Sequence, residues 1–165
     1  MEEIKNKVKE SGLIQLDLAQ FKPDIEQVGI DLAPQLWQEL VLKEKDFREW
    51  VKDNDWQIYE NKAVHIYCSS DAILPTWAFM LVASKLEKSS FVITGSAIEL
   101  EKELIKAKIS ELDTKNFIDG RVIIKGCSDI HEPKYAMVTL VRHLQPVVKS
   151  IMYGEPCSTV PIFKR

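Results

Sequence analysis

The sequence has no long apolar run and no recognisable export signal. Its longest clear apolar run, residues 77–83, is seven residues long, whereas a membrane-spanning helix needs about 20. The first ten residues alternate charged and uncharged side chains and lack the apolar segment of a signal peptide. We therefore expect a cytoplasmic protein without a membrane span.

Positive charge is also scarce. The chain has 22 Lys and Arg residues against 25 Asp and Glu residues, which gives a net charge of −3. Proteins that bind nucleic acids usually carry a basic excess that neutralises phosphates, so nucleic acid is not an expected partner. The remaining composition, 45% hydrophobic and 28% charged residues over 165 positions, is typical of a folded globular chain.

No stretch rich in Gly, Ser or Pro divides the chain, so we predict a single domain over residues 1–165. From about residue 62, short β-branched or aromatic runs alternate with longer segments of helical spacing. This alternation predicts an α/β fold with a mostly parallel central sheet flanked by helices. The predicted strands are residues 63–67, 91–94, 121–125 and 150–153, and the predicted helices are residues 75–86, 97–109 and 133–144.

The first 60 residues are predicted to be an irregular N-terminal extension of the βα-repeat core at 61–165. Weaker strand patterns lie at residues 13–18 and 27–32. Residues 43–51 form a charged helical segment with one apolar stripe, which includes Phe47 and Trp50. We expect this stripe to pack either on the sheet or on a second subunit.

The chain also resembles itself at a shift of 58 residues. Residues 64–86 align without gaps on residues 122–144, with seven identical pairs that include Asp71 with Asp129. This match predicts two equivalent strand–loop–helix segments. The alternative is that any two such segments share apolar positions because both must build a core.

Three cysteines carry the strongest indication of chemistry. An odd number of cysteines in a reducing compartment argues against a disulfide framework. Each cysteine follows a predicted strand, and parallel strands end at one edge of a sheet, so the thiols can converge there. We therefore predict thiolate ligands for zinc or an iron–sulfur cluster. The predicted ligands are Cys68, Cys127 and Cys157, with Asp71, Asp129 and His131 as candidate further ligands.

Two alternatives for the cysteines stay open, because the sequence has no Cys-x-x-Cys pair. Free cysteines are often small packing residues in a core. One thiol could instead be the nucleophile of an enzyme, with Cys127 beside His131 or Cys157 beside Glu155. The sequence thus leaves open whether the protein is an enzyme.

Three segments, residues 42–49, 68–78 and 149–161, resemble the bacterial family known as domain of unknown function 2480. The resemblance covers the whole chain, includes all three cysteines and brings no assigned activity. It implies an association with SUF-type iron–sulfur cluster assembly, which makes assembly proteins expected partners and favours an iron–sulfur cluster over zinc.

We therefore expect a metal- or iron–sulfur-binding accessory protein. The alternative is a structural or interaction protein that forms a homodimer through the helix with Phe47 and Trp50 or through the N-terminal arm.

Overall fold

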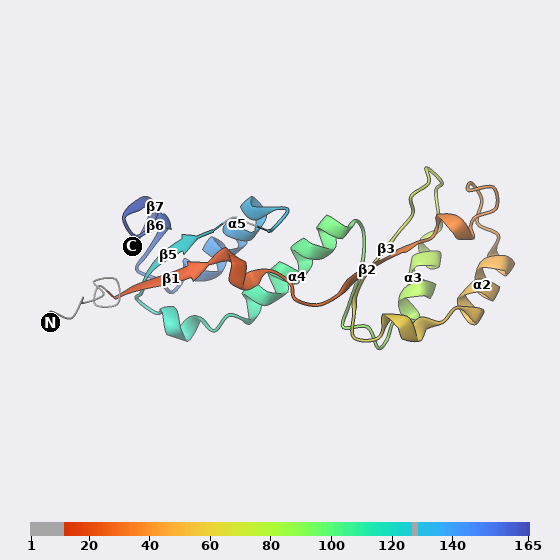
Figure 1. Cartoon of the computed structure of the whole chain (residues 1–165), viewed down its shortest axis with the longest axis horizontal. Helices are drawn as coiled ribbons and strands as arrows, with labels where there is room; N and C mark the ends of the chain where they lie inside the picture. The colour runs from red at the N-terminus through yellow and green to blue at the C-terminus, as the bar shows by residue number, and fades with distance from the viewer. Residues whose placement is uncertain (1–11, 127–128) are drawn as a thin grey trace, which may run out of the picture. The chain divides into compact units, whose positions relative to one another are not determined.

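A computed structural model of the chain describes residues 12–126 and 129–165 (Figure 1). The fold is α/β with mostly parallel strands flanked by helices, as predicted, but the strands form two sheets. The chain divides into two compact units: unit 1 comprises Met1–Pro23 and Lys102–Arg165, and unit 2 comprises Asp24–Glu101. Unit 2 is thus inserted into the chain of unit 1. That the whole chain makes one domain stays a prediction.

Unit 2 has a three-stranded parallel sheet with strand order β2-β3-β4. The predicted strand at 27–32 is β2, so part of the supposedly irregular extension belongs to this sheet. The elements of unit 2 are β2 (Gln27–Asp31), η2 (Ala33–Gln35), α2 (Glu44–Asp53), η3 (Trp56–Tyr59), β3 (Ala63–Tyr67), α3 (Thr76–Ser84) and β4 (Phe91–Thr94), where η denotes a 3-10 turn.

The core of unit 2 lies between its two helices and its sheet. Phe47 and Val51 of α2 pack with Ala78 and Val82 of α3 and with strand residues such as Val64. The apolar stripe on α2 was expected to pack either on the sheet or on a second subunit. The structure shows it packed within unit 2. Phe47 is fully buried, so this side chain is not available as a dimer contact. The homodimer itself stays a prediction.

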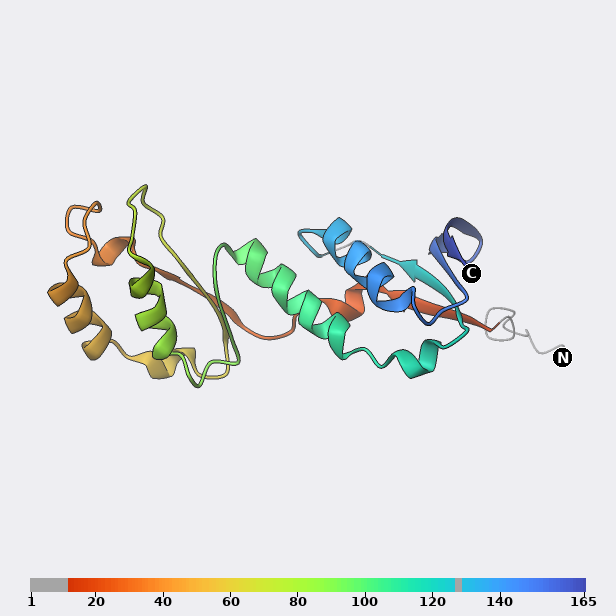
Figure 2. The ribbon, with the colours of Figure 1, turned by 180° about the vertical axis from the view of Figure 1, so that it is seen from behind.

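Unit 1 has a four-stranded sheet with order β1-β5-β6-β7, in which β7 alone is antiparallel to its neighbour. Helices α4 and α5 pack on the same side of this sheet (Figure 2). Its elements are β1 (Leu13–Asp17), η1 (Leu18–Phe21), α4 (Ala97–Glu111, of which the part from Lys102 on belongs to unit 1), η4 (Thr114–Phe117), β5 (Arg121–Lys125), α5 (Pro133–Leu144), β6 (Ser150–Glu155) and β7 (Ser158–Lys164).

The two units repeat one arrangement: strand, 3-10 turn, helix, 3-10 turn, central strand, helix, strand. The predicted 58-residue shift relates β3 to β5, and it continues back into α2 and α4. The buried pairs related by this shift are Phe47 and Ile105, Val51 and Ile109, Ala78 and Ala136, Val82 and Leu140, and Leu86 and Leu144. The predicted equivalence is therefore confirmed, over a longer stretch than the sequence indicated.

Hydrogen bonding supports the same equivalence. Asp55 accepts a hydrogen bond from the backbone N–H of Gln57 at 3.0 Å, and Asp113 accepts one from Lys115 at 3.0 Å. The two aspartates are 58 residues apart, and each caps the 3-10 turn before a central strand. The repeat thus extends to local capping contacts.

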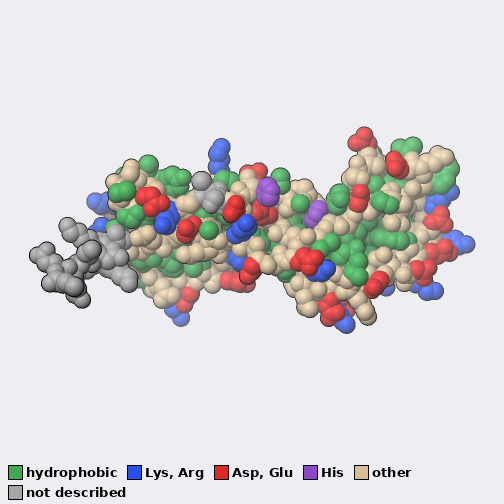
Figure 3. Space-filling view, in the orientation of Figure 1, with side chains coloured by type: hydrophobic (Ala, Val, Ile, Leu, Met, Phe, Trp, Pro, Cys, Tyr) green, Lys and Arg blue, Asp and Glu red, His purple; other side chains and the backbone are tan. Residues whose placement is uncertain are grey.

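Charged side chains of both signs are mixed over the face drawn in Figure 3, in keeping with the nearly balanced composition. Among the helices in the described part of the chain, none has the length and apolar character needed to cross a membrane.

Candidate functional site

The predicted ligands are divided between the two units. Cys68 and Asp71 follow β3 in unit 2, whereas Asp129, His131 and Cys157 belong to unit 1. Cys127 lies outside the described residues. Within 12–126 and 129–165, no three His, Cys, Asp or Glu side chains are grouped as a metal ion requires. Convergence of all three thiols therefore stays a prediction.

In unit 2, Asp31 ties the end of β2 to the loop that follows β3. Its carboxylate accepts hydrogen bonds from the backbone N–H of Ser69 at 2.9 Å, from the Ser69 hydroxyl at 2.6 Å and from the backbone N–H of Ala33 at 3.0 Å. Burial raises the pKa of Asp31, but these hydrogen bonds favour the carboxylate and bring its pKa below the ordinary value. Asp31 thereby holds the loop that contains Cys68.

The thiol of Cys68 lies in this loop and has polar neighbours. It is half-buried, and its Sγ lies 3.3 Å from the Ser70 hydroxyl and 3.7 Å from the Ser70 carbonyl oxygen. The Ser70 hydroxyl also accepts a hydrogen bond from the backbone N–H of Ala72 at 3.3 Å. Cys68 is not one of the buried core residues of unit 2. Asp71, further along the loop, is exposed.

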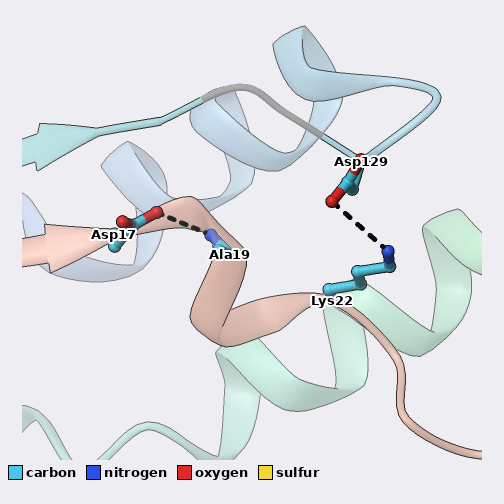
Figure 4. A network of polar contacts seen from close by, with 4 residues as sticks. All are labelled: Asp17, Ala19, Lys22 and Asp129. Atoms are coloured by element: carbon cyan, nitrogen blue, oxygen red, sulfur yellow. Dashed lines mark hydrogen bonds and ion pairs between the residues drawn. The ribbon is translucent and has the colours of Figure 1, made fainter.

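In unit 1, the corresponding edge of the sheet carries Asp17, Lys22 and Asp129 (Figure 4). Asp17 ends β1 and accepts a hydrogen bond from the backbone N–H of Ala19 at 2.9 Å. Lys22 Nζ lies 3.7 Å from Asp129 Oδ2, and both side chains are largely exposed, so this ion pair is weak. A hollow of about 350 Å³ is lined by Lys22, Asp129, Ile130 and His131.

The turn between β6 and β7, also in unit 1, contains Cys157. This thiol is exposed, so it is not a packing residue. Lys125 Nζ at the end of β5 lies 3.8 Å from Glu155 Oε2 at the end of β6, which joins the two strand ends. Cys157 and the loop that begins at Gly126 therefore share one edge of the sheet. Glu155, the candidate base for Cys157, is thus engaged with a lysine.

Asp17 and Asp31 are the residues that the sequence reasoning missed. Each ends the first strand of its unit, and each accepts a hydrogen bond from the N–H two residues later. A Cβ at Gly126 would lie 2.5 Å from Asp17 Oδ1, so Gly126, which follows β5, lies close to Asp17. In the same way, Ser69 in the loop after β3 lies close to Asp31. The signal was present as the repeated tripeptide Asp-Leu-Ala, at residues 17–19 and 31–33.

Replacement of Asp31 by asparagine is expected to destabilise unit 2 by about 1 kcal/mol at pH 7, because exposed charge-assisted hydrogen bonds are lost. The pKa of Asp31 is lowered on folding, so its stabilising contribution is present above the ordinary value of 3.8 and is lost as the pH falls through the folded pKa. The stability gap between wild type and Asp31→Asn should therefore narrow between pH 7 and pH 3. Urea titrations followed by tryptophan fluorescence measure the unfolding free energies of the two proteins at each pH, since all four tryptophans lie in unit 2. A gap that stays constant with pH would contradict the assignment.

Comparison with known proteins identifies one family. The family described as "Protein of unknown function (DUF2480)" matches residues 2–165. No curated protein and no solved structure matches the chain.

Proposed function

In this chain, which belongs to the DUF2480 family, we propose a metal- or iron–sulfur-binding accessory function that uses the thiolates of Cys68, Cys127 and Cys157. One observation carries the proposal: the two thiols in the described part of the chain lie outside both cores, near the carboxyl ends of parallel strands. Packing residues would be buried in the cores instead.

Unit 1 contributes most of the proposed ligands. Cys157 is exposed in the turn that follows β6, and Cys127 directly follows Gly126 in the sequence. Thiolates suit zinc and iron–sulfur clusters, and a histidine can complete either kind of site. The Asp129 carboxylate already faces Lys22 at 3.7 Å, so a metal would have to displace that lysine. Asp129 and His131 are both candidate fourth ligands from unit 1.

Cys68 is the proposed ligand from unit 2. Its contact with the Ser70 hydroxyl is weak enough for a metal to replace, since thiol hydrogen bonds are weak. Substitution of Cys68 therefore tests the proposed ligand of unit 2 separately from those of unit 1.

The test is anaerobic purification from iron-supplemented cells, followed by elemental analysis and a visible spectrum. Cys68→Ser, Cys127→Ser and Cys157→Ser are each expected to reduce bound metal by about 10-fold or more, because loss of a direct ligand costs at least as much as loss of a supporting contact. Ser158→Ala, which alters the same turn and keeps every thiol, is the matched control and should retain the metal. A brown sample indicates an iron–sulfur cluster, and a colourless sample that contains zinc indicates a tetrahedral zinc site.

Two results bear on the proposal differently. If Cys68→Ser alone retains the metal, Cys68 is not a ligand and the proposal is wrong for that residue. A wild-type protein that folds without metal would overturn the whole proposal. If the site holds an iron–sulfur cluster, the proteins of cluster assembly are the proposed partners.

A structural or interaction protein that forms a homodimer is the second candidate. It is supported by large apolar side chains on unit 2 that face solvent, above all Ile73, which is 98% exposed, and Met80, which is 66% exposed. Such side chains are typical of protein interfaces when they gather on one surface. A folded, metal-free wild type would favour this function.

A further inference from the structure

Unit 1 contains an apolar groove that the thiol site does not use. The groove has a volume of about 630 Å³ and runs between α5 on one side and β6 and β7 on the other. Its walls are almost entirely carbon, and the side chains that form them include Met137, Val138 and Val141 of α5, Met152 and Tyr153 of β6, and Ile162 of β7. Val138 is 63% exposed and Ile162 is 50% exposed. The groove therefore leaves apolar side chains open to solvent.

The topology of unit 1 explains why the groove is open. Helices α4 and α5 each precede a parallel strand, and both cover the same face of the sheet (Figure 2). Strands β6 and β7 are antiparallel and are joined by the short turn at Pro156 and Cys157, so no connecting helix lies over β7. The groove occupies the place of a third helix in this layer.

Two cations flank the groove on α5. Lys134 and Arg142 lie one helical turn before and one turn after Val138, so they are about 12 Å apart along the helix axis. Both are exposed, and within residues 12–126 and 129–165 no acidic side chain forms an ion pair with either. An occupant with two acidic side chains at matching positions would complement them.

This charge argues against a second copy of the chain as the occupant. In a two-fold symmetric contact centred on Val138, the two α5 helices are antiparallel, and Lys134 would face Arg142 of the second copy. Addition of a strand to the free edge of β7 is disfavoured too, because Pro161 lies within that strand and lacks an N–H donor. The expected occupant is therefore an acidic helix.

We propose that the groove binds an amphipathic helix of a partner protein. Apolar side chains of that helix, spaced three and four residues apart, would fill the groove over β6 and β7. Acidic side chains about eight residues apart on the same helix would pair with Lys134 and Arg142. This inference does not depend on the thiols or on any metal.

The probe is a synthetic, fluorescently labelled helical peptide with a leucine stripe and two glutamates eight residues apart. In fluorescence anisotropy, the full-length protein is expected to bind it at least about 10-fold more tightly than a scrambled peptide of the same composition, because helix-in-groove recognition needs the stripe. The Lys134→Glu/Arg142→Glu variant should bind about 10-fold more weakly, and a peptide with lysines in place of the glutamates should restore its affinity. Val138→Glu should abolish binding.

Lys106→Glu, an exposed substitution on α4, is the matched charge control and should leave binding unchanged. Circular dichroism verifies that each variant is folded. Equal affinity of the protein for the peptide with the leucine stripe and for the scrambled peptide would overturn the proposal. The proposal would also be wrong if the peptide with lysines did not restore the affinity of the Lys134→Glu/Arg142→Glu variant. Sedimentation showing a wild-type dimer that Val138→Glu converts to a monomer would overturn it too, since a second copy would then fill the groove.

Discussion

Replacement of Phe47 by alanine is expected to lower the free energy of unfolding of unit 2 by about 3–5 kcal/mol, the largest effect predicted for any single substitution. Phe47 is fully buried between α2 and the sheet. Its ring centroid lies 5.4 Å from that of Trp50 and 5.9 Å from that of Trp77. Truncation therefore removes apolar burial and two aromatic contacts, and it leaves a cavity that neighbouring side chains fill only in part.

Tryptophan fluorescence during urea denaturation measures this loss, because Trp37, Trp50, Trp56 and Trp77 all lie in unit 2. Met80→Ala is the matched control: it shortens a large apolar side chain on α3 that is mostly exposed, so a change within about 0.5 kcal/mol is expected. If Phe47→Ala were as mild as the control, while the oligomeric state of the protein changed, Phe47 would be an interface residue and its place in the core would be wrong.

Replacement of Gly154 by alanine is expected to destabilise unit 1 by about 2–4 kcal/mol, through backbone strain and a steric overlap that add together. Gly154 has a φ of +119°, a backbone conformation that residues other than glycine rarely adopt. In addition, an added Cβ would lie 2.6 Å from the carbonyl oxygen of Ser158. The obstacle belongs to the backbone of β7 and cannot rotate away. The substitution therefore disturbs the pairing of β6 with β7 and, with it, the turn that carries Cys157.

Hydrogen–deuterium exchange resolved by peptide measures this effect, since it reports β6, β7 and α5 separately from unit 2. Gly12→Ala is the matched control. Gly12 also has a positive φ, +67°, but no atom lies within 4 Å of its added Cβ, so only about 1 kcal/mol of backbone strain is expected. Equal effects of the two substitutions would show that the contact with Ser158 contributes nothing.

The strands and helices were the most predictable part of the structure. The predicted strands at 63–67 and 121–125 coincide with β3 and β5, because short β-branched runs that are buried on a sheet have few alternatives. The weaker strand pattern at 27–32, within the predicted irregular extension, contains β2, which pairs with β3 in the sheet of unit 2. Its apolar content was too low to distinguish an edge strand from a loop.

The insertion of unit 2 into unit 1 was not predictable from local patterns. Local patterns reveal a boundary where a linker separates consecutive domains, whereas here the chain passes from one unit to the other at residues 23–24 and again within α4. The repeat relating α2 to α4 was equally hidden. Phe47 corresponds to Ile105 and Val51 to Ile109, and only burial at these positions, rather than residue identity, is shared.

The candidate site shows the same limit. Cys68 and Cys157 were recognised because thiols carry distinctive chemistry, whereas Asp17 and Asp31 were missed because a single aspartate in a loop has many ordinary roles. Their importance depends on contacts across the sheet, such as that between Asp31 and Ser69, which are 38 residues apart in the chain. The apolar groove also went unnoticed, since Val138 and Ile162 come from different elements that meet only in the folded unit.

By itself, the sequence determined the fold class, most strand positions, the 58-residue repeat and the thiols as candidate ligands. These features follow from local composition and periodicity, which reflect whether a side chain is buried. Tertiary structure alone decided that the strands form two sheets, that Asp17 and Asp31 hold the strand-end loops, and that a groove opens beside α5. Each of these depends on which segments pair across the chain, and pairing is decided by the packing of many side chains at once rather than by any one segment.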